Sequence, residues 1–168
     1  IFFMTPFIFF SAYQLSTIFS DRVDAGYQNF INYSHDMDTK KITSVGSRLT
    51  FNINSIEMIK KNPFLGVGTG DFPDEYKKIN MTNTPHMNNV TNPHNMYTLV
   101  TAQLGLIGLI SFLSVFYFQI KIALHSKNTL LRDVGIALPV LFLVIMFSDS
   151  YLLGHFTTLM FIFFSSFL

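Results

Sequence analysis

The feature that most constrains this chain is an uncharged apolar run at residues 97–120, "YTLVTAQLGLIGLISFLSVFYFQI". The run has 24 residues and contains no Asp, Glu, Lys or Arg. As an α-helix it would reach about 36 Å, which exceeds the hydrocarbon core of a bilayer at about 30 Å. Such a run is typical of a membrane-spanning helix. We therefore predict a transmembrane span at 97–120.

The rest of the sequence follows the same pattern. The chain is 49% hydrophobic and only 12% charged, and residues 1–20 carry no charged side chain, whereas most charges lie between 21 and 96. This segregation is typical of membrane spans around an aqueous loop. We predict a second span at 1–20 and a two-helix transmembrane hairpin at 134–168. Because both ends are apolar and the first residue is Ile, we expect the C-terminal part of a larger polytopic protein.

The connection at 121–133 predicts how the chain is oriented in the membrane. It carries three basic residues and one acid: Lys121, Lys127, Arg132 and Asp133. The positive-inside rule places such a short connection in the cytoplasm. The loop at 21–96 then faces the opposite side of the membrane, which in a bacterium is the periplasm or the outer surface. The expected fold class is an all-α polytopic membrane protein, with apolar spans around one large extracytoplasmic loop; in a bacterium the membrane would be the inner membrane.

Within this loop, one amphipathic helix is predicted. Residues 21–46 are polar and show no period, so we expect irregular structure or a short helix there. Ser47 can cap a helix, and Asn62-Pro63 can end it. Between them, apolar residues recur at spacings of three and four: Leu49, Ile53 and Ile56.

The block "GVGTG" at 66–70 is a candidate binding segment. Its alternating glycines, Gly66, Gly68 and Gly70, can expose backbone N–H groups to an anion. The Lys-Ser or Lys-Thr pair of a nucleotide-binding P-loop is missing, however. A compact turn with positive-φ positions is the simpler interpretation. We keep the three glycines as candidate substrate-binding residues.

The position of His94 in the sequence makes it a candidate catalytic residue. It lies in "PHNMY" at 93–97, within about one turn of the predicted span, so its imidazole is expected at the membrane boundary on the loop side. An imidazole can exchange a proton near neutral pH, which suits a general base. A helix cap is the alternative interpretation.

Other kinds of chemistry find less support in the sequence. His35, His86 and His94 lack the spacing of metal ligands, so we predict neither a metal site nor a cofactor. The absence of cysteine excludes disulfides within the chain. A net charge of +1 gives no general attraction to nucleic acid. Asp149 and His155, at the apex of the predicted hairpin, keep an open role.

Three ordered blocks carry a resemblance to a known family: "GSRL" at 46–49, "IEMIKKNPFLGVGTGDF" at 56–72 and "PHNMYTLVTAQLGLIGLI" at 93–110. Together they resemble the O-antigen ligase-like family of bacterial membrane glycosyltransferases, which also includes some O-antigen polymerases and protein O-oligosaccharyltransferases. The resemblance covers roughly residues 1–165. Matching its motifs implies catalytic roles for Arg48 and His94. The family often has a tryptophan where this chain has Asn52, which argues against a stacking role at that position.

The resemblance also implies a donor glycan linked through pyrophosphate to undecaprenol. His94 would remove the proton of the acceptor hydroxyl, and Arg48 would stabilise the departing pyrophosphate without a metal ion. Asn95 and Tyr97 are candidate substrate-binding residues beside the base. The expected partners are this donor, lipid A-core or another hydroxyl acceptor, and membrane lipids. An O-antigen polymerase and a protein O-oligosaccharyltransferase remain alternatives, as does part of a lipid-linked sugar transporter or flippase.

Overall fold

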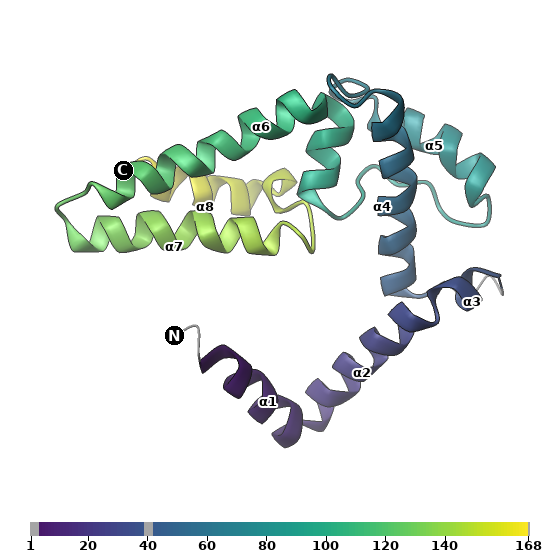
Figure 1. Ribbon diagram of the computed structural model, residues 1–168, viewed down its shortest axis with the longest axis horizontal. Helices are drawn as coiled ribbons and strands as arrows, with labels where there is room; N and C mark the ends of the chain where they lie inside the picture. The colour runs from purple at the N-terminus through teal and green to yellow at the C-terminus, as the bar shows by residue number, and fades with distance from the viewer. Residues whose placement is uncertain (1–3, 39–41, 168) are drawn as a thin grey trace. The chain divides into compact units, whose positions relative to one another are not determined.

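The computed structural model describes residues 4–38 and 42–167 (Figure 1). Over these ranges the regular structure is helical and contains no strand, which confirms the predicted all-helical class. The chain divides into two compact units, Ile1–Leu49 and Thr50–Leu168. We describe each unit by itself.

The first unit contains α1 (Thr5–Leu15), α2 (Thr17–Ile31), α3 (Tyr33–Asp38) and the start of α4. Ser16 separates α1 from α2, because its backbone is extended and its side chain accepts a hydrogen bond from the Phe19 N–H at 3.3 Å. The described part of the apolar segment 1–20 is thus shared between two helices, and the role of this segment as a span stays a prediction.

The region after Ser16 is more helical than the sequence predicts. We expected irregular structure or a short helix at 21–46, but α2 continues to Ile31 and α3 follows directly. A helical period in the sequence marks a buried face, and α2 has no buried residue. The sequence of α2 therefore shows no helical period of apolar residues, although the segment is a helix.

Helix α4 (Ser44–Lys61) begins earlier than predicted. The Gly46 N–H donates to the Thr43 side-chain oxygen at 3.0 Å, so Thr43 caps the helix and the predicted cap, Ser47, lies inside the first turns. The helix ends at Lys61, immediately before Asn62-Pro63, as predicted.

The buried face of α4 is not the predicted apolar stripe. Ile53 and Ile56 are each 46% exposed. The helix instead buries a face that is partly polar: Thr50, Phe51, Asn54, Ser55 and Met58. Asn54 donates to Tyr76 Oη at 3.3 Å and to Thr84 Oγ1 at 2.9 Å, which offsets the cost of burying its amide. Tyr76 belongs to α5 (Phe72–Asn83), so these bonds tie α4 to the region of α5.

The rest of the second unit is a helical bundle of α6 (Met96–Leu124), α7 (Thr129–Ile145), the 3-10 turn η2 (Tyr151–Leu153) and α8 (His155–Ser165). Figure 1 shows α6 and α7 side by side, with α8 next to them. Their shared core contains Phe116, Phe142 and Phe161, and the rings of Phe142 and Phe161 lie 4.9 Å apart. Helices α7 and α8 occupy the region of the predicted hairpin.

Among the described residues, α6 is the helix that has the length and apolar composition to cross a membrane. It contains the predicted span 97–120 but is not continuous. At Gly105 the backbone leaves the helical region, with φ 67° and ψ −169°, and α6 bends there (Figure 1). The sequence analysis did not predict this break.

A loop from the end of α4 fills the break. In a continuous helix the N–H groups of Leu106 and Ile107 would bond to the carbonyls four residues earlier. Here they donate to Pro63 O at 2.9 Å and Phe64 O at 3.4 Å. The two freed carbonyls accept hydrogen bonds from the same loop, Ala102 O from Val67 and Gln103 O from Gly68, each at 2.9 Å. The backbone of residues 63–68 thus bonds to the N–H groups and carbonyls of α6 that would bond to each other in a continuous helix.

Candidate functional site

The backbone of His94 has an unusual conformation that its neighbours hold in place. Its φ is 55°, in the left-handed region, which costs a non-glycine residue about 1–2 kcal/mol. The His94 N–H donates to Asn92 Oδ1 at 2.7 Å, and the same oxygen accepts a bond from Ser150 Oγ at 2.8 Å. Asn52 donates to the Pro93 carbonyl at 3.1 Å. Groups from three parts of the chain therefore fix this turn.

The His94 side chain contacts a carboxylate. Its Nδ1 lies 3.1 Å from Asp149 Oδ1, and both side chains are about one-third exposed (37% and 36%). A carboxylate accepts hydrogen bonds, so this contact assigns the proton to Nδ1 of the neutral imidazole. The free Nε2 then carries a lone pair that can accept a proton. The Ser150 N–H also donates to Asp149 Oδ1, at 2.7 Å, and so holds the carboxylate.

Helix α4 reaches this site through two adjacent residues. The ring of Phe51 lies 6.2 Å from the imidazole of His94, with the planes tilted by 32°. Asn52 bonds to the Pro93 carbonyl and accepts from Thr98 Oγ1 at 2.8 Å, so it joins α4 to the first turn of α6. Asn52 thus holds the turn that carries His94.

Asn95 and Tyr97, the predicted substrate-binding residues, connect α6 to the end of α7. Asn95 caps α6 by accepting from the Thr98 N–H at 3.1 Å, and its amide donates to Phe147 O at 3.3 Å. The Tyr97 hydroxyl donates to Leu143 O, and its ring lies 4.5 Å from the ring of Phe147. Both residues therefore position the site, and substrate binding by them stays a prediction.

The three glycines form the predicted positive-φ turn, with φ of 70° at Gly66, 112° at Gly68 and 93° at Gly70. The Gly66 N–H donates to Asn62 O at 3.0 Å, and the Gly68 N–H donates to Gln103 O. These two N–H groups are engaged by the protein itself. A role of the glycines in substrate binding stays a prediction.

Arg48, the second predicted catalytic residue, lies in α4 and belongs to the first unit, whereas His94 belongs to the second. The structure brings together His94, Asn95 and Tyr97 around the start of α6. A joint action of Arg48 and His94 is part of the function proposed below.

Sequence reasoning left two residues of the site unassigned. Asp149 was noted as an ionisable residue inside an apolar region, which is a functional signal. Its partner is 55 residues away in the sequence, so only the fold reveals the contact. Asn52 was noted for its departure from the family pattern, and its two bonds across the site carry no sequence signal.

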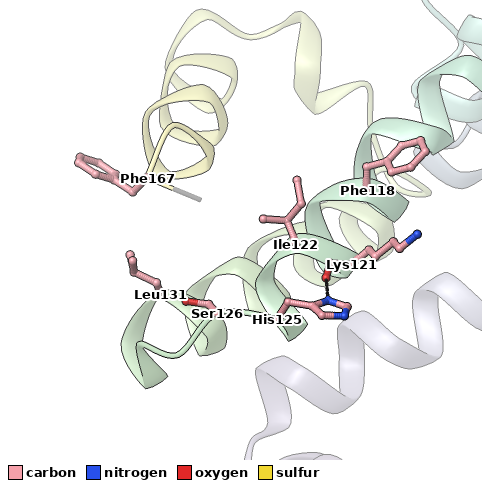
Figure 2. Close-up of a pocket in the computed structure, with 7 residues that line it drawn as sticks. All are labelled: Phe118, Lys121, Ile122, His125, Ser126, Leu131 and Phe167. Carbon is pink, nitrogen blue, oxygen red and sulfur yellow. Dashed lines mark hydrogen bonds between the residues drawn. The ribbon is translucent and has the colours of Figure 1, made fainter.

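Other features lie apart from this site. Within the residues that the structure describes, no group of three or more His, Asp or Glu side chains is arranged to hold a metal ion. A cavity of about 500 Å³ lies at the C-terminal end of α6, the end opposite to His94, and Figure 2 shows residues that line it. Its lining comes mainly from α6 and the connection that follows: Phe118, Lys121, Ile122, His125, Ser126, Leu131 and Phe167.

Comparison with known proteins gives one family. A family model described as O-antigen ligase matches residues 1–113, which is about two thirds of the 168 residues. The match includes Arg48, the glycine block and His94, and it ends before Asp149. The search of curated proteins found no match. The chain therefore belongs to the O-antigen ligase family, a membrane protein class with a glycan-transfer role in O-antigen and lipopolysaccharide biosynthesis, for which a lipid-linked glycan and a lipid A-core acceptor are the general substrates.

Proposed function

We propose that the chain transfers a glycan from undecaprenyl pyrophosphate to a hydroxyl of lipid A-core at the periplasmic face of the inner membrane. His94 is the general base of this reaction. The observation that carries the proposal is the contact of His94 Nδ1 with Asp149, because it leaves Nε2 to take a proton. Membership of the O-antigen ligase family supports the choice of reaction.

The reaction is a displacement at the anomeric carbon of the donor sugar. The acceptor oxygen forms the new glycosidic bond while its proton passes to His94 Nε2. The bond from the anomeric carbon to the pyrophosphate oxygen breaks, and the undecaprenyl pyrophosphate leaves with the electron pair. A positioned general base typically contributes about 10²–10⁴-fold to such a step.

Asp149 acts on this reaction through His94. Its carboxylate holds the ring so that Nε2 carries the lone pair, and it stabilises the imidazolium that forms when the proton arrives. The Ser150 N–H keeps Asp149 Oδ1 in place. Asp149 is therefore a positioning residue for the base.

Arg48 is proposed to bind the pyrophosphate. Its guanidinium offers a planar set of donors that can pair with two phosphate oxygens and stabilise the negative charge of the leaving group. The guanidinium supplies the positive charge that this stabilisation requires, so no metal ion is needed. Support for this role comes from the family match, which includes Arg48, and from the chemistry of its side chain.

The proposed membrane arrangement follows the charges. The segment 121–133, with its excess of Lys and Arg, runs from the last turn of α6 into the start of α7, whereas His94 precedes the N-terminal end of α6. We place the connection in the cytoplasm and His94 at the periplasmic face. Residues 1–20 and 134–168 are proposed to be membrane segments as well. The exposed Ile53 and Ile56 of α4 would contact the membrane interface.

An assay with three acceptors tests the proposal. The purified full chain in lipid vesicles receives an undecaprenyl-pyrophosphate glycan together with lipid A-core, a second lipid-linked glycan or an acceptor protein with Ser and Thr. We expect transfer to lipid A-core, unchanged by a metal chelator. Transfer only to the second glycan would identify a polymerase, and transfer only to protein an oligosaccharyltransferase. Movement of the donor across the membrane without transfer would support a flippase and contradict the proposal.

A further inference from the structure

The break at Gly105 lies inside the helix that has the length to cross a membrane, where irregular backbone is unusual. In the hydrocarbon core each unsatisfied backbone group costs several kcal/mol, so irregular backbone is tolerated there only where the protein satisfies it. Two N–H groups and two carbonyls at the break, those of Leu106, Ile107, Ala102 and Gln103, are bonded to residues 63–68. The broken segment is therefore compatible with a position at the edge of the hydrocarbon core.

The length of α6 after the break agrees with this position. Residues 106–124 would reach about 28 Å as a helix, close to the about 30 Å of the hydrocarbon core. A crossing segment that starts at Leu106 places Gly105 at one boundary of the core. The loop bonded to Gly105's neighbours must then lie at the same depth.

Two glycines allow the loop and the helix to approach so closely. A Cβ atom on Gly66 would lie 2.4 Å from the backbone carbon of Gln103, and one on Gly105 would lie 2.1 Å from Phe64 O. Such distances leave no room for a side chain at either position. The loop is thus fixed to α6 through its backbone.

The tip of this loop is apolar and uncovered. Phe64 is 65% exposed and Leu65 is 74% exposed. On the adjoining turns of α6, Leu106, Ile107 and Ile110 are exposed as well. Burying a side chain such as Phe or Leu is worth about 1.5–3 kcal/mol, so this surface favours an apolar environment. It continues directly into the outer face of the segment that crosses the membrane.

Two cations precede the tip. Lys60 and Lys61 end α4, and both are exposed. Lysine side chains at a membrane boundary lay their methylene stems along apolar surface and hold the ammonium at the level of the lipid phosphates. The order of two lysines and then an apolar tip matches the order of phosphates and acyl chains in a bilayer.

We propose that residues 63–65 insert into the acyl-chain region of the lipid bilayer, with Lys60 and Lys61 at the phosphates. The loop then anchors the end of α4 at the membrane, beside the point where α6 enters it. If the proposed glycan transfer is correct, this anchor also holds the His94 site at the depth of the donor pyrophosphate. The insertion itself does not depend on that activity.

The chain contains no tryptophan, so a single introduced tryptophan reports its own surroundings. We would place the full chain with Phe64→Trp in phosphatidylcholine–phosphatidylglycerol vesicles whose acyl chains are brominated or unbrominated. The matched control is Met81→Trp, because Met81 is 64% exposed and lies on α5. Circular dichroism of both variants would show that the helical content is retained.

Insertion predicts a blue-shifted emission for Phe64→Trp, strong quenching by brominated lipid and little quenching by aqueous iodide. The Met81→Trp control should show the opposite pattern. Leu65→Trp tests the neighbouring position and should repeat the result of Phe64→Trp. Quenching of Phe64→Trp by iodide, or by neither agent, would overturn the proposal, because it would place the tip in water or under protein. A failed glycan-transfer assay would leave this result unaffected.

Discussion

His94 depends on residues that are distant in the sequence. Its position before an apolar run could be predicted, because membrane boundary and imidazole chemistry are both local features. Its contact with Asp149, and the bond from Asn52 to the carbonyl of the preceding Pro93, could not be predicted, since they require α4, the start of α6 and the end of α7 to meet. At the residue scale, the sequence therefore indicates the base and the fold supplies the groups that orient it.

Replacing Asp149 tests how the base is oriented. In Asp149→Asn, the amide can donate to Nδ1 and favour the tautomer with its proton on Nε2, which removes the basic lone pair. We expect kcat to fall by about 10²-fold or more while the KM for the donor changes little. Asp149→Glu, which keeps the carboxylate, should recover part of the rate. Equal losses in both variants, with reduced thermal stability, would indicate a structural role instead.

Asn52 allows a second test at this scale. Asn52→Leu removes the bonds to Pro93 O and Thr98 Oγ1, and each lost bond costs about 1–3 kcal/mol where the partner stays buried. We expect a lower Tm and a slower transfer, because the turn that carries His94 loses its support. Asn88→Leu, at an exposed position, is the control and should leave both quantities unchanged. Unchanged transfer in Asn52→Leu would show that the turn is fixed without this residue.

At the scale of elements, the sequence predicted the end of α4 but underestimated the helical content of 21–46 and did not predict the buried surface of α4. The end of α4 followed from Asn62-Pro63, a local signal. The buried face of α4 did not follow from the apolar period, because a hydrogen-bonded polar network around Asn54 replaces an apolar core there. The break in α6 was missed for a similar reason, since it depends on backbone bonds to a distant loop.

Substitutions of the two glycines at this break should have non-additive effects on stability. Gly66→Ala and Gly105→Ala each introduce a Cβ into occupied space at a positive φ, and we expect each to lower the free energy of unfolding by about 2 kcal/mol or more. Because both changes separate the same loop from α6, the double variant should lose less than the sum. Chemical unfolding in detergent measures all three.

Gly26→Ala is the control for these substitutions. Gly26 lies inside α2, and a Cβ there meets nothing within 4 Å. Alanine in a helix interior is favoured over glycine by about 1 kcal/mol, so this variant should not lose stability. Strictly additive losses in Gly66→Ala and Gly105→Ala would contradict a shared contact.

At the scale of the whole molecule, the account predicts a side of the membrane for each end of α6. The chain has no cysteine, so single cysteines can be labelled without background. In intact cells stripped of the outer membrane, an impermeant maleimide should label Lys78→Cys, which lies in the predicted periplasmic loop. It should label Lys127→Cys only after the inner membrane is opened. Labelling of both variants in intact cells would contradict the proposed orientation.

The central claim is that His94 is the base for glycan transfer, and the most direct measurement is the transfer rate of the purified His94→Gln protein. We would compare it with wild type and with His125→Gln, a histidine at the other end of α6, using the same lipid-linked donor and lipid A-core. The account predicts that His94→Gln loses about 10²-fold or more in kcat, whereas His125→Gln keeps the wild-type rate. A wild-type rate in properly folded His94→Gln protein would contradict the account.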